Sequence, residues 1–336
     1  MNQEELLALA EEAGLVYADE GMEWRQRIGR GRGFTYREPD GSPVSETVRE
    51  WIETCAIPPA WRSVRIATRT DSHILATGYD RQGRKQYVYH PRWEEVRDEV
   101  KFERMWEFGR RIGRLRRRID GDLRLPGLPR PKVVALAVAV LDRTLIRIGN
   151  RRSASNGDAY GLTTLTTEHV QVRGAQVHIE FVGKGGGENQ VVFEDRRMAT
   201  LISRCEELSG QSLFSYTAED SVSSIGSGDV NDYLAAAMGG RFTAKDFRTW
   251  GASTTATHEL ATRTGEDPDR IVLEALDATA ERLGNSREVC RDAYVHPTVV
   301  DAFHDGRLGS AWRRSRTGVW LQRAESAVSK LRPESD

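Results

Sequence analysis

The spacing of apolar residues changes once along this chain, near residue 90, and that change constrains the fold most strongly. Before it, a glycine-rich basic loop is expected at residues 27–33, and short segments with strand character follow at 34–36, 64–67 and 74–79, separated by turn signals. After it, apolar residues recur mainly at helical spacing. We therefore predict an α+β fold with a small β-rich domain over residues 1–90 and a larger, mainly α-helical domain over residues 91–336.

The second domain is predicted to contain one buried helix and one small sheet. Residues 133–146 are mostly apolar but only 14 in number, too few to span a bilayer and suited to a core helix. Three segments alternate apolar and polar side chains, which predicts a three-stranded unit: 169–172, 176–181 and 190–193. Lys184 then lies on a hairpin tip that its following glycines are expected to make mobile. A polar loop is expected at 221–228.

Charge is distributed unevenly along the chain. The formal net charge is −1, but residues 101–152 contain 15 Lys and Arg against 5 Asp and Glu, a local net charge of +10. Such a block is expected of a surface that neutralises phosphates, and a solvated helix face is the plainer alternative. Three scattered cysteines speak against a zinc site and a disulfide framework. The acidic N-terminus lacks the basic stretch of a signal peptide, so we expect a cytoplasmic protein.

Four segments of the second domain carry the residue types that phosphoryl transfer needs. They are Arg147-Ile148-Gly149-Asn150, Gly183-Lys184-Gly185-Gly186-Gly187, Lys245-Asp246-Phe247-Arg248-Thr249-Trp250 and Asp292-Ala293-Tyr294. A free phenol titrates near pH ~10 and is a poor nucleophile at neutral pH, so a tyrosine that attacks a phosphodiester needs positive charge around the phosphate. Two arginines and a lysine would supply that charge.

In type, order and spacing these segments resemble the active-site boxes of type IB DNA topoisomerases, in particular the short form found in bacteria and poxviruses. The resemblance extends over nearly the whole chain. It implies an N-terminal DNA-binding domain and the catalytic fold that topoisomerases IB share with tyrosine recombinases, in a C-shaped clamp. It also implies a monomer that relaxes supercoiled duplex DNA without ATP, metal or any other cofactor and is associated with the nucleoid.

The resemblance assigns a role to each residue of the four boxes. Tyr294 is the nucleophile and forms a 3'-phosphotyrosyl ester. Arg147 and Arg248 donate paired N–H groups to the non-bridging phosphate oxygens, a task that suits the planar guanidinium; an ordinary salt bridge is the alternative for each. Lys184 protonates the departing 5'-oxygen.

One position departs from the pattern of the poxvirus-like enzymes. Most of them carry a histidine nine residues before the tyrosine, whereas this chain has Asn285 there. An amide donates a hydrogen bond to a phosphate oxygen but is neither an acid nor a base. We therefore expect Asn285 to stabilise the transition state as a neutral donor, with helix capping as the alternative.

Candidate DNA contacts lie in both domains. The resemblance places residues 83–90 on the DNA, which makes Gln86, Tyr87 and Tyr89 candidates for base and phosphate contacts. An amphipathic edge strand whose tyrosines pack is the alternative. Further candidates for phosphate contacts are Lys245 and, in the basic segment, Arg116, Arg117 and Arg151.

Two other functions remain open from the sequence. Tyrosine recombinases use a similar set of residues, but their box around the second arginine usually reads His-x-x-Arg-His, whereas here Lys245, Arg248 and Thr249 occupy those positions. A non-catalytic DNA-binding protein would use the basic segment as a clamp. That function would leave the order of the four boxes unexplained.

Overall fold

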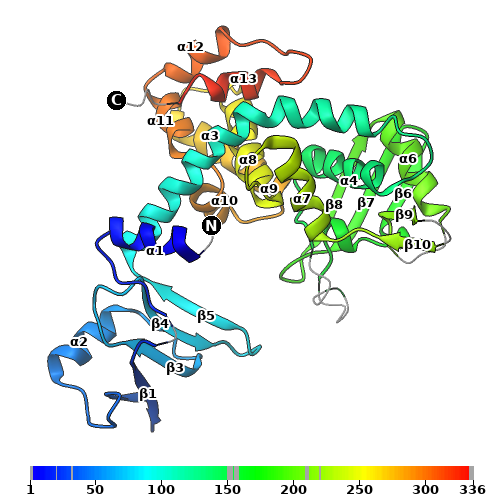
Figure 1. The fold of residues 1–336 in the computed structure, drawn as a ribbon. Helices are drawn as coiled ribbons and strands as arrows, with labels where there is room; N and C mark the ends of the chain where they lie inside the picture. Colours follow the sequence, from blue (N-terminus) through cyan, green and yellow to red (C-terminus); the bar gives the residue numbers. More distant parts are fainter. Residues whose placement is uncertain are drawn as a thin grey trace. The chain divides into compact units, whose positions relative to one another are not determined.

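The computed structural model describes residues 3–19, 21–31, 33–149, 154, 159–208, 212–218 and 221–332. The chain forms two compact units, Met1–Lys101 and Phe102–Asp336. Helix α3 (Pro91–Asp122) runs from the first unit into the second (Figure 1). The predicted domain boundary at residues 90 and 91 falls at the start of this helix, whereas the division between the compact units falls within it.

The first unit is an antiparallel sheet with two helices. Its five strands have the order β2-β1-β3-β4-β5. Their bounds are β1 Trp24–Arg30, β2 Gly33–Arg37, β3 Arg62–Ala67, β4 Ile74–Tyr79 and β5 Lys85–Tyr89. The helices are α1 (Gln3–Glu12) and α2 (Glu46–Thr54), and Ile52 of α2 packs with Val64, Ile66 and Ala76 of the sheet.

Two elements of this unit differ from the prediction. Residues 27–33 were expected to form a glycine-rich loop, but β1 extends to Arg30 and pairs with β2 in register from Gln26 opposite Arg37. Gly29 pairs with Phe34 in this register although glycine weakens a strand. Helix α2 was not predicted; Ser45 begins it, because its side chain accepts a hydrogen bond from the amide of Val48.

The second unit is mainly helical and is built around two helices. Helix α4 (Arg130–Thr144) is buried along most of its length, as its apolar sequence predicts. Helix α8 (Ala244–Thr262) contacts α4 and four other helices. The remaining helices described are α6 Arg196–Glu206, α7 Ser227–Met238, α9 Pro268–Leu283, α10 Arg287–Ala293, α11 Pro297–His304, α12 Arg307–Arg313 and α13 Arg323–Ser329.

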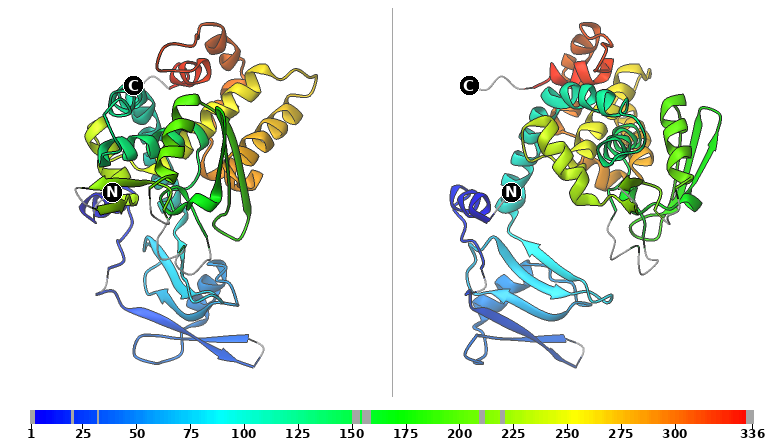
Figure 2. Two further views of the ribbon diagram at one scale, coloured as in Figure 1. Left: turned by 90° about the vertical axis from the view of Figure 1, so that its right-hand side faces the viewer. Right: turned by 45° about the vertical axis from the view of Figure 1, so that its right-hand side comes forward.

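A three-stranded antiparallel sheet, in the order β6-β7-β8, completes this unit. Its strands are β6 Val170–Arg173, β7 Gln176–Val182 and β8 Glu188–Glu194, and α6 packs on it (Figure 2). Lys184 lies at the β7–β8 tip, as predicted. A second hairpin, β9 (Ser215–Ala218) and β10 (Ser221–Ser224), replaces the first part of the loop expected at 221–228, because cross-strand pairing orders this polar segment.

The predicted α+β class is confirmed. Among the described residues, each helix is too short or too polar to cross a membrane.

Candidate active site

Arg147 lies in a turn that two glycines bring close to a neighbouring segment. Helix α4 ends at Leu145, which adopts a left-handed conformation with φ of +58°. Beyond it, the carbonyl oxygen of Arg147 accepts a hydrogen bond of 2.8 Å from the amide of Leu162. A Cβ atom on Gly161 would lie 2.5 Å from that oxygen, and one on Gly149 would lie 2.8 Å from the hydroxyl oxygen of Thr164. Arg147 can take this position only because Gly149 and Gly161 have no side chains.

Arg248 joins three parts of the second unit. Its side chain extends from α8 and the residue is only 4% exposed. Nη1 donates to the carbonyl of Leu145 at 2.5 Å, and Nη2 donates to the carbonyl of Leu283, at the end of α9, at 2.9 Å. The guanidinium carbon lies 4.9 Å from the centre of the Tyr294 ring. Its Nε is buried without a hydrogen-bond partner among the described residues.

Tyr294 is half-buried at the C-terminal end of α10. Its backbone is held by Ser253 of α8, whose hydroxyl donates to the carbonyl of Tyr294 at 3.4 Å and accepts from the amide of His296 at 2.9 Å. Helix α8 thus supplies both Arg248 and Ser253, whose hydroxyl holds the backbone at Tyr294 and His296. Ser253 was not predicted from the sequence. The only indication there is that it follows Arg248 by five residues, on the same predicted helix.

The charges around Tyr294 favour the phenolate. Burial raises the pKa of the Tyr294 phenol, but the charges of Arg248, Arg147 and Lys245 and a hydrogen bond from Arg248 outweigh it and lower the pKa below its usual value. Burial and the charge of Arg147 also lower the pKa of Arg248, a residue type that nevertheless stays protonated in proteins. The neighbouring cations therefore favour ionisation of the residue predicted to be the nucleophile.

Asn285 follows Gly284, the C-cap of α9, and contacts Arg147. Nη2 of Arg147 donates to Oδ1 of Asn285 at 2.5 Å, which orients the amide. The Nδ2 atom of Asn285 is buried without a partner among the described residues. The cap of the next helix is Ser286, whose hydroxyl accepts from the amide of Val289. Helix capping is therefore not the role of the Asn285 side chain.

The two predicted lysines lie at the periphery. Lys184 is exposed on the tip of the β7–β8 hairpin and lies outside the contacts that join Arg147, Arg248, Asn285 and Tyr294. Lys245 is exposed in the first turn of α8, and the neighbouring Asp246 is bound to Arg104 at 2.8 Å. Within the described chain, no cluster of three His, Cys, Asp or Glu side chains is arranged to hold a metal ion.

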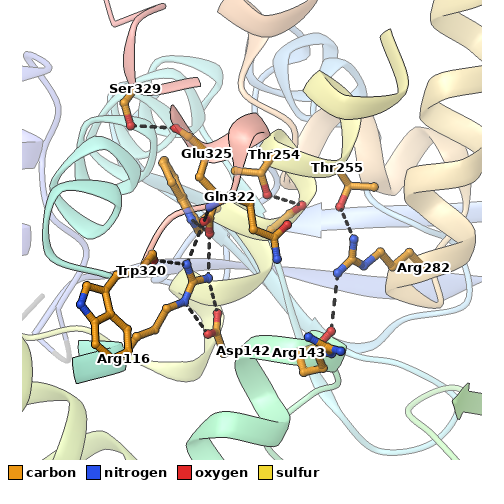
Figure 3. A network of polar contacts seen from close by, with 12 residues as sticks. Arg116, Asp142, Arg143, Thr254, Thr255, Arg282, Trp320, Gln322, Glu325 and Ser329 are labelled. Carbon is orange, nitrogen blue, oxygen red and sulfur yellow. Dashed lines mark hydrogen bonds and ion pairs between the residues drawn. The ribbon is translucent and has the colours of Figure 1, made fainter. Parts of the chain in front are cut away.

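Arg116 was predicted to contact a DNA phosphate, but its side chain is engaged by other groups of the protein. It donates to Asp142 and to Glu325 at 2.7 Å each, and to the carbonyl of Trp320 at 2.7 Å (Figure 3). Burial alone would lower its pKa, but the two carboxylates raise it. A guanidinium enclosed in this way has no free edge for a phosphate, so the geometry disagrees with a DNA contact. Arg117 is exposed on α3 and stays a prediction, while Arg151 lies outside the described residues.

The three residues of β5 that were predicted to contact DNA do not all point to the same face of the sheet, because side chains alternate along a strand. Tyr87 and Tyr89 share one face, with ring centres 5.7 Å apart. Tyr87 lines a hollow of the first unit together with Arg65, Thr77, Tyr79 and Lys85, whereas Tyr89 packs against the cluster around Trp93. Gln86 points to the opposite face and donates to Asp80 at 3.0 Å. Gln86 and Tyr87 therefore lie on opposite faces of the sheet, and both stay predictions as DNA contacts.

Comparisons with known proteins identify the family of this chain. Residues 90–309 match the model of the eukaryotic DNA topoisomerase I catalytic core, and residues 33–80 match the bacterial DNA topoisomerase IB N-terminal domain. The chain is 29% identical to DNA topoisomerase 1B of Acanthamoeba polyphaga mimivirus over 297 residues, 84% of this chain and 88% of the relative. It is 22% identical to DNA topoisomerase 1B of vaccinia virus (strain Copenhagen) over 245 residues, 70% of this chain and 74% of the relative.

Among solved structures, the chain is similar to the XerH site-specific recombinase bound to its difH substrate. Identity is 16%, with 59% of this chain and 50% of that chain covered and a TM-score of 0.36, a likeness too low to bear on function. The catalytic-core model, in contrast, matches well over half of the sequence. This chain therefore belongs to the type IB DNA topoisomerase family, in the short form found in viruses and bacteria.

Proposed function

We propose that this protein relaxes supercoiled duplex DNA by transient cleavage of one strand, with Tyr294 as the nucleophile. One observation carries the proposal: beside a phenol whose pKa is lowered, the Nε of Arg248 and the Nδ2 of Asn285 are buried donors without partners among the described residues. Leaving such a donor unsatisfied costs about 1–3 kcal/mol. The non-bridging oxygens of a scissile phosphate are acceptors of the required charge and size.

The protein groups then divide the chemistry among them. The Tyr294 phenolate, formed by loss of the phenol proton to water, attacks phosphorus in line and forms a phosphotyrosyl ester at the 3' end, while the bond from phosphorus to the 5'-oxygen breaks. Lys184 gives its proton to that oxygen, which leaves as a hydroxyl. Religation is the reverse reaction, with the 5'-oxygen as the nucleophile. One phosphodiester is exchanged for one phosphotyrosyl ester, so no external energy source enters the balance.

The hydrogen bonds of Arg248 determine which of its donors face the phosphate. A guanidinium has five N–H donors. Two of them are engaged by the carbonyls of Leu145 and Leu283, which hold the group in place. Three N–H groups remain, Nε among them, and they are shared between the Tyr294 oxygen and the phosphate. Asn285 adds its own N–H group, oriented by Arg147. These donors are in place before the charge develops, as electrostatic stabilisation requires.

Duplex DNA is the partner that the family and the basic segment support. We propose further that the chain acts as a monomer in the cytoplasm, associated with the nucleoid. Sedimentation of the enzyme with and without a duplex that fits one copy tests the first point. A 2:1 complex at saturation would contradict it.

The proposal is tested by relaxation of negatively supercoiled plasmid in EDTA without ATP. The wild-type protein is expected to relax plasmids of arbitrary sequence, whereas Tyr294→Phe is expected to bind DNA with unchanged affinity and relax none. A covalent protein–DNA adduct should form with the wild type alone. Relaxation by Tyr294→Phe would remove the nucleophile assignment. Activity only on plasmids with paired specific sites would favour a recombinase, and binding without strand breaks would favour a DNA-binding protein.

A further inference from the structure

The Lys184 hairpin is held at both edges of its tip. On the β7 edge, the carbonyl of Val182 accepts from the amide of Tyr160 at 2.8 Å, and the following residue, Gly161, packs against Arg147. On the β8 edge, Asn189 lies opposite Phe181, one pair before the last pair of the register, Val182 with Glu188. Neither the sequence motifs nor the roles described above involve Asn189.

One end of the Asn189 amide closes the base of the tip. Its Nδ2 donates to the carbonyl of Gly187 at 3.0 Å, and the same carbonyl accepts from the amide of Gly183 at 2.8 Å. A Cβ atom on Gly183 would lie 2.3 Å from Nδ2, closer than real Cβ contacts. Gly183 therefore has no side chain where the Asn189 amide lies, directly before Lys184.

The other end of the amide faces the loop that carries Asn285. A Cβ atom on Gly284 would lie 2.7 Å from Oδ1 of Asn189. Gly284 is the C-cap of α9, with φ of +61°, and precedes the residue that Arg147 orients. Two glycines from distant parts of the chain thus leave room for one amide, which links the Lys184 tip to the Asn285 turn.

We propose that Asn189 is a positioning residue for the Lys184 ammonium. Asn189 packs the base of the hairpin tip against the α9 C-cap. It thereby confines a tip that Gly185 and Gly186, both with positive φ, would otherwise leave free. The confined lysine spends more time within reach of the departing oxygen, and proton transfer requires that reach. This inference rests on the proposed role of Lys184 as the proton donor.

Asn189→Ala tests the inference by single-turnover cleavage of a duplex oligonucleotide. Cleavage of ordinary DNA is expected to slow by about tenfold, since misplacement of a catalytic group reduces the rate without removing it. On DNA with a 5'-bridging sulfur, the leaving thiolate needs no proton, so the rate should return to the wild-type value. DNA affinity should be unchanged. The control is Gln190→Ala, because the adjacent Gln190 amide bonds to Glu180 instead.

Two combined variants separate positioning from general damage. Gly183→Ala places a methyl group against Asn189 and should slow cleavage as Asn189→Ala does, yet it should add nothing in the Asn189→Ala background, where room for the methyl exists. Lys184→Ala with Asn189→Ala should be no slower than Lys184→Ala alone, since a positioning group has no effect once its target is gone.

The outcomes distinguish this inference from the proposed function. If sulfur rescues Lys184→Ala but not Asn189→Ala, Asn189 does not position the lysine and the inference fails alone. Additive rate losses in the double variant would lead to the same conclusion. If sulfur rescues neither variant, Lys184 is not the proton donor, and both the proposed role and the inference are overturned.

Discussion

Two arginine clusters share helix α8, and they differ in what surrounds the positive charge. In the Arg116 cluster, Asp142 and Glu325 neutralise the guanidinium, and Glu325 also accepts from Trp250 of α8 at 3.1 Å (Figure 3). In the Arg248 cluster, the contacts are to backbone carbonyls and to the ring of Tyr294, without a carboxylate partner among the described residues. The chain thus places carboxylates around the structural Arg116, whereas Arg248, where we propose that a phosphate binds, has backbone and aromatic contacts instead.

The difference is energetic as well as geometric. A buried charge whose partner is removed costs several kcal/mol, so the Arg116 cluster holds α3, α4, α8 and α13 together only while it is complete. The Arg248 cluster places Arg147 and Arg248 near one another, so that each charge disfavours the other. Repulsion of this kind is relieved when a phosphate binds, which favours the anion over the empty site.

The largest effect is expected from exchanging arginine for lysine in each cluster. Arg248→Lys keeps the charge but loses the planar fork, so the rate of single-turnover cleavage should fall by ~10²-fold or more. Arg116→Lys, the matched control, should leave that rate within about threefold at temperatures where it is folded and lower the melting temperature. A near wild-type rate for Arg248→Lys would show that charge alone suffices.

The second prediction breaks the structural cluster without changing its shape. Glu325→Gln keeps an acceptor for Trp250 but removes one of the two charges that balance Arg116. The free energy of unfolding should fall by about 3 kcal/mol, measured by urea denaturation, with the cleavage rate of the folded enzyme little changed. Loss of activity in a fully folded variant would mean that α13 acts on the chemistry directly.

The third prediction introduces the missing countercharge into the catalytic cluster. Asn285→Asp places a carboxylate against Arg147 and next to the phosphate position, where it repels the anion and no longer donates. Cleavage should be about tenfold slower than in Asn285→Ala, and the deficit should shrink at a pH low enough to protonate the new carboxyl. Equal rates for the two variants would show that the Asn285 side chain does not lie close to the phosphate.

The smallest effect concerns the pH profile. Because cations lower the pKa of Tyr294, the cleavage rate should rise with pH and level off below pH ~10, the value for a free phenol. Lys245→Ala removes the weakest of the three cationic contributions and should move the plateau to higher pH, with a change of only a few-fold in rate at neutral pH. Lys330→Ala is the control, and a profile unchanged by Lys245→Ala would exclude its charge from the site.

The sequence predicted the catalytic cluster better than its supports. Arg147, Arg248, Asn285 and Tyr294 come from segments with recognisable local patterns, and the structure brings them together. Ser253 and Asn189 contact residues far along the chain, and such contacts depend on packing that no local pattern encodes. The position of Lys184 on a hairpin tip was predictable, whereas what holds the tip was not.

Arg116 shows a signal that was present in the sequence. It lies four residues after Ile112 and three before Ile119, both buried, so helical spacing places it on the inner face of α3. The basic composition of the segment obscured that spacing. In the first unit, glycines at 29, 31 and 33 suggested a loop, but pairing with the neighbouring strand outweighed their local preference.

Leu145 has a consequence for engineering a more heat-resistant variant. Left-handed helix ends favour glycine, and replacing leucine there relieves about 1–2 kcal/mol of backbone strain. In this protein, however, the Leu145 side chain fills the space that Gly251 of α8 leaves open, and its carbonyl holds the Arg248 guanidinium. Replacing Leu145 with glycine for thermostability would therefore weaken the contact that holds the Arg248 guanidinium in place. The loss of this buried side chain, about 2–5 kcal/mol for a leucine, exceeds the strain that is relieved, so the left-handed leucine serves both the stability of the fold and the position of Arg248.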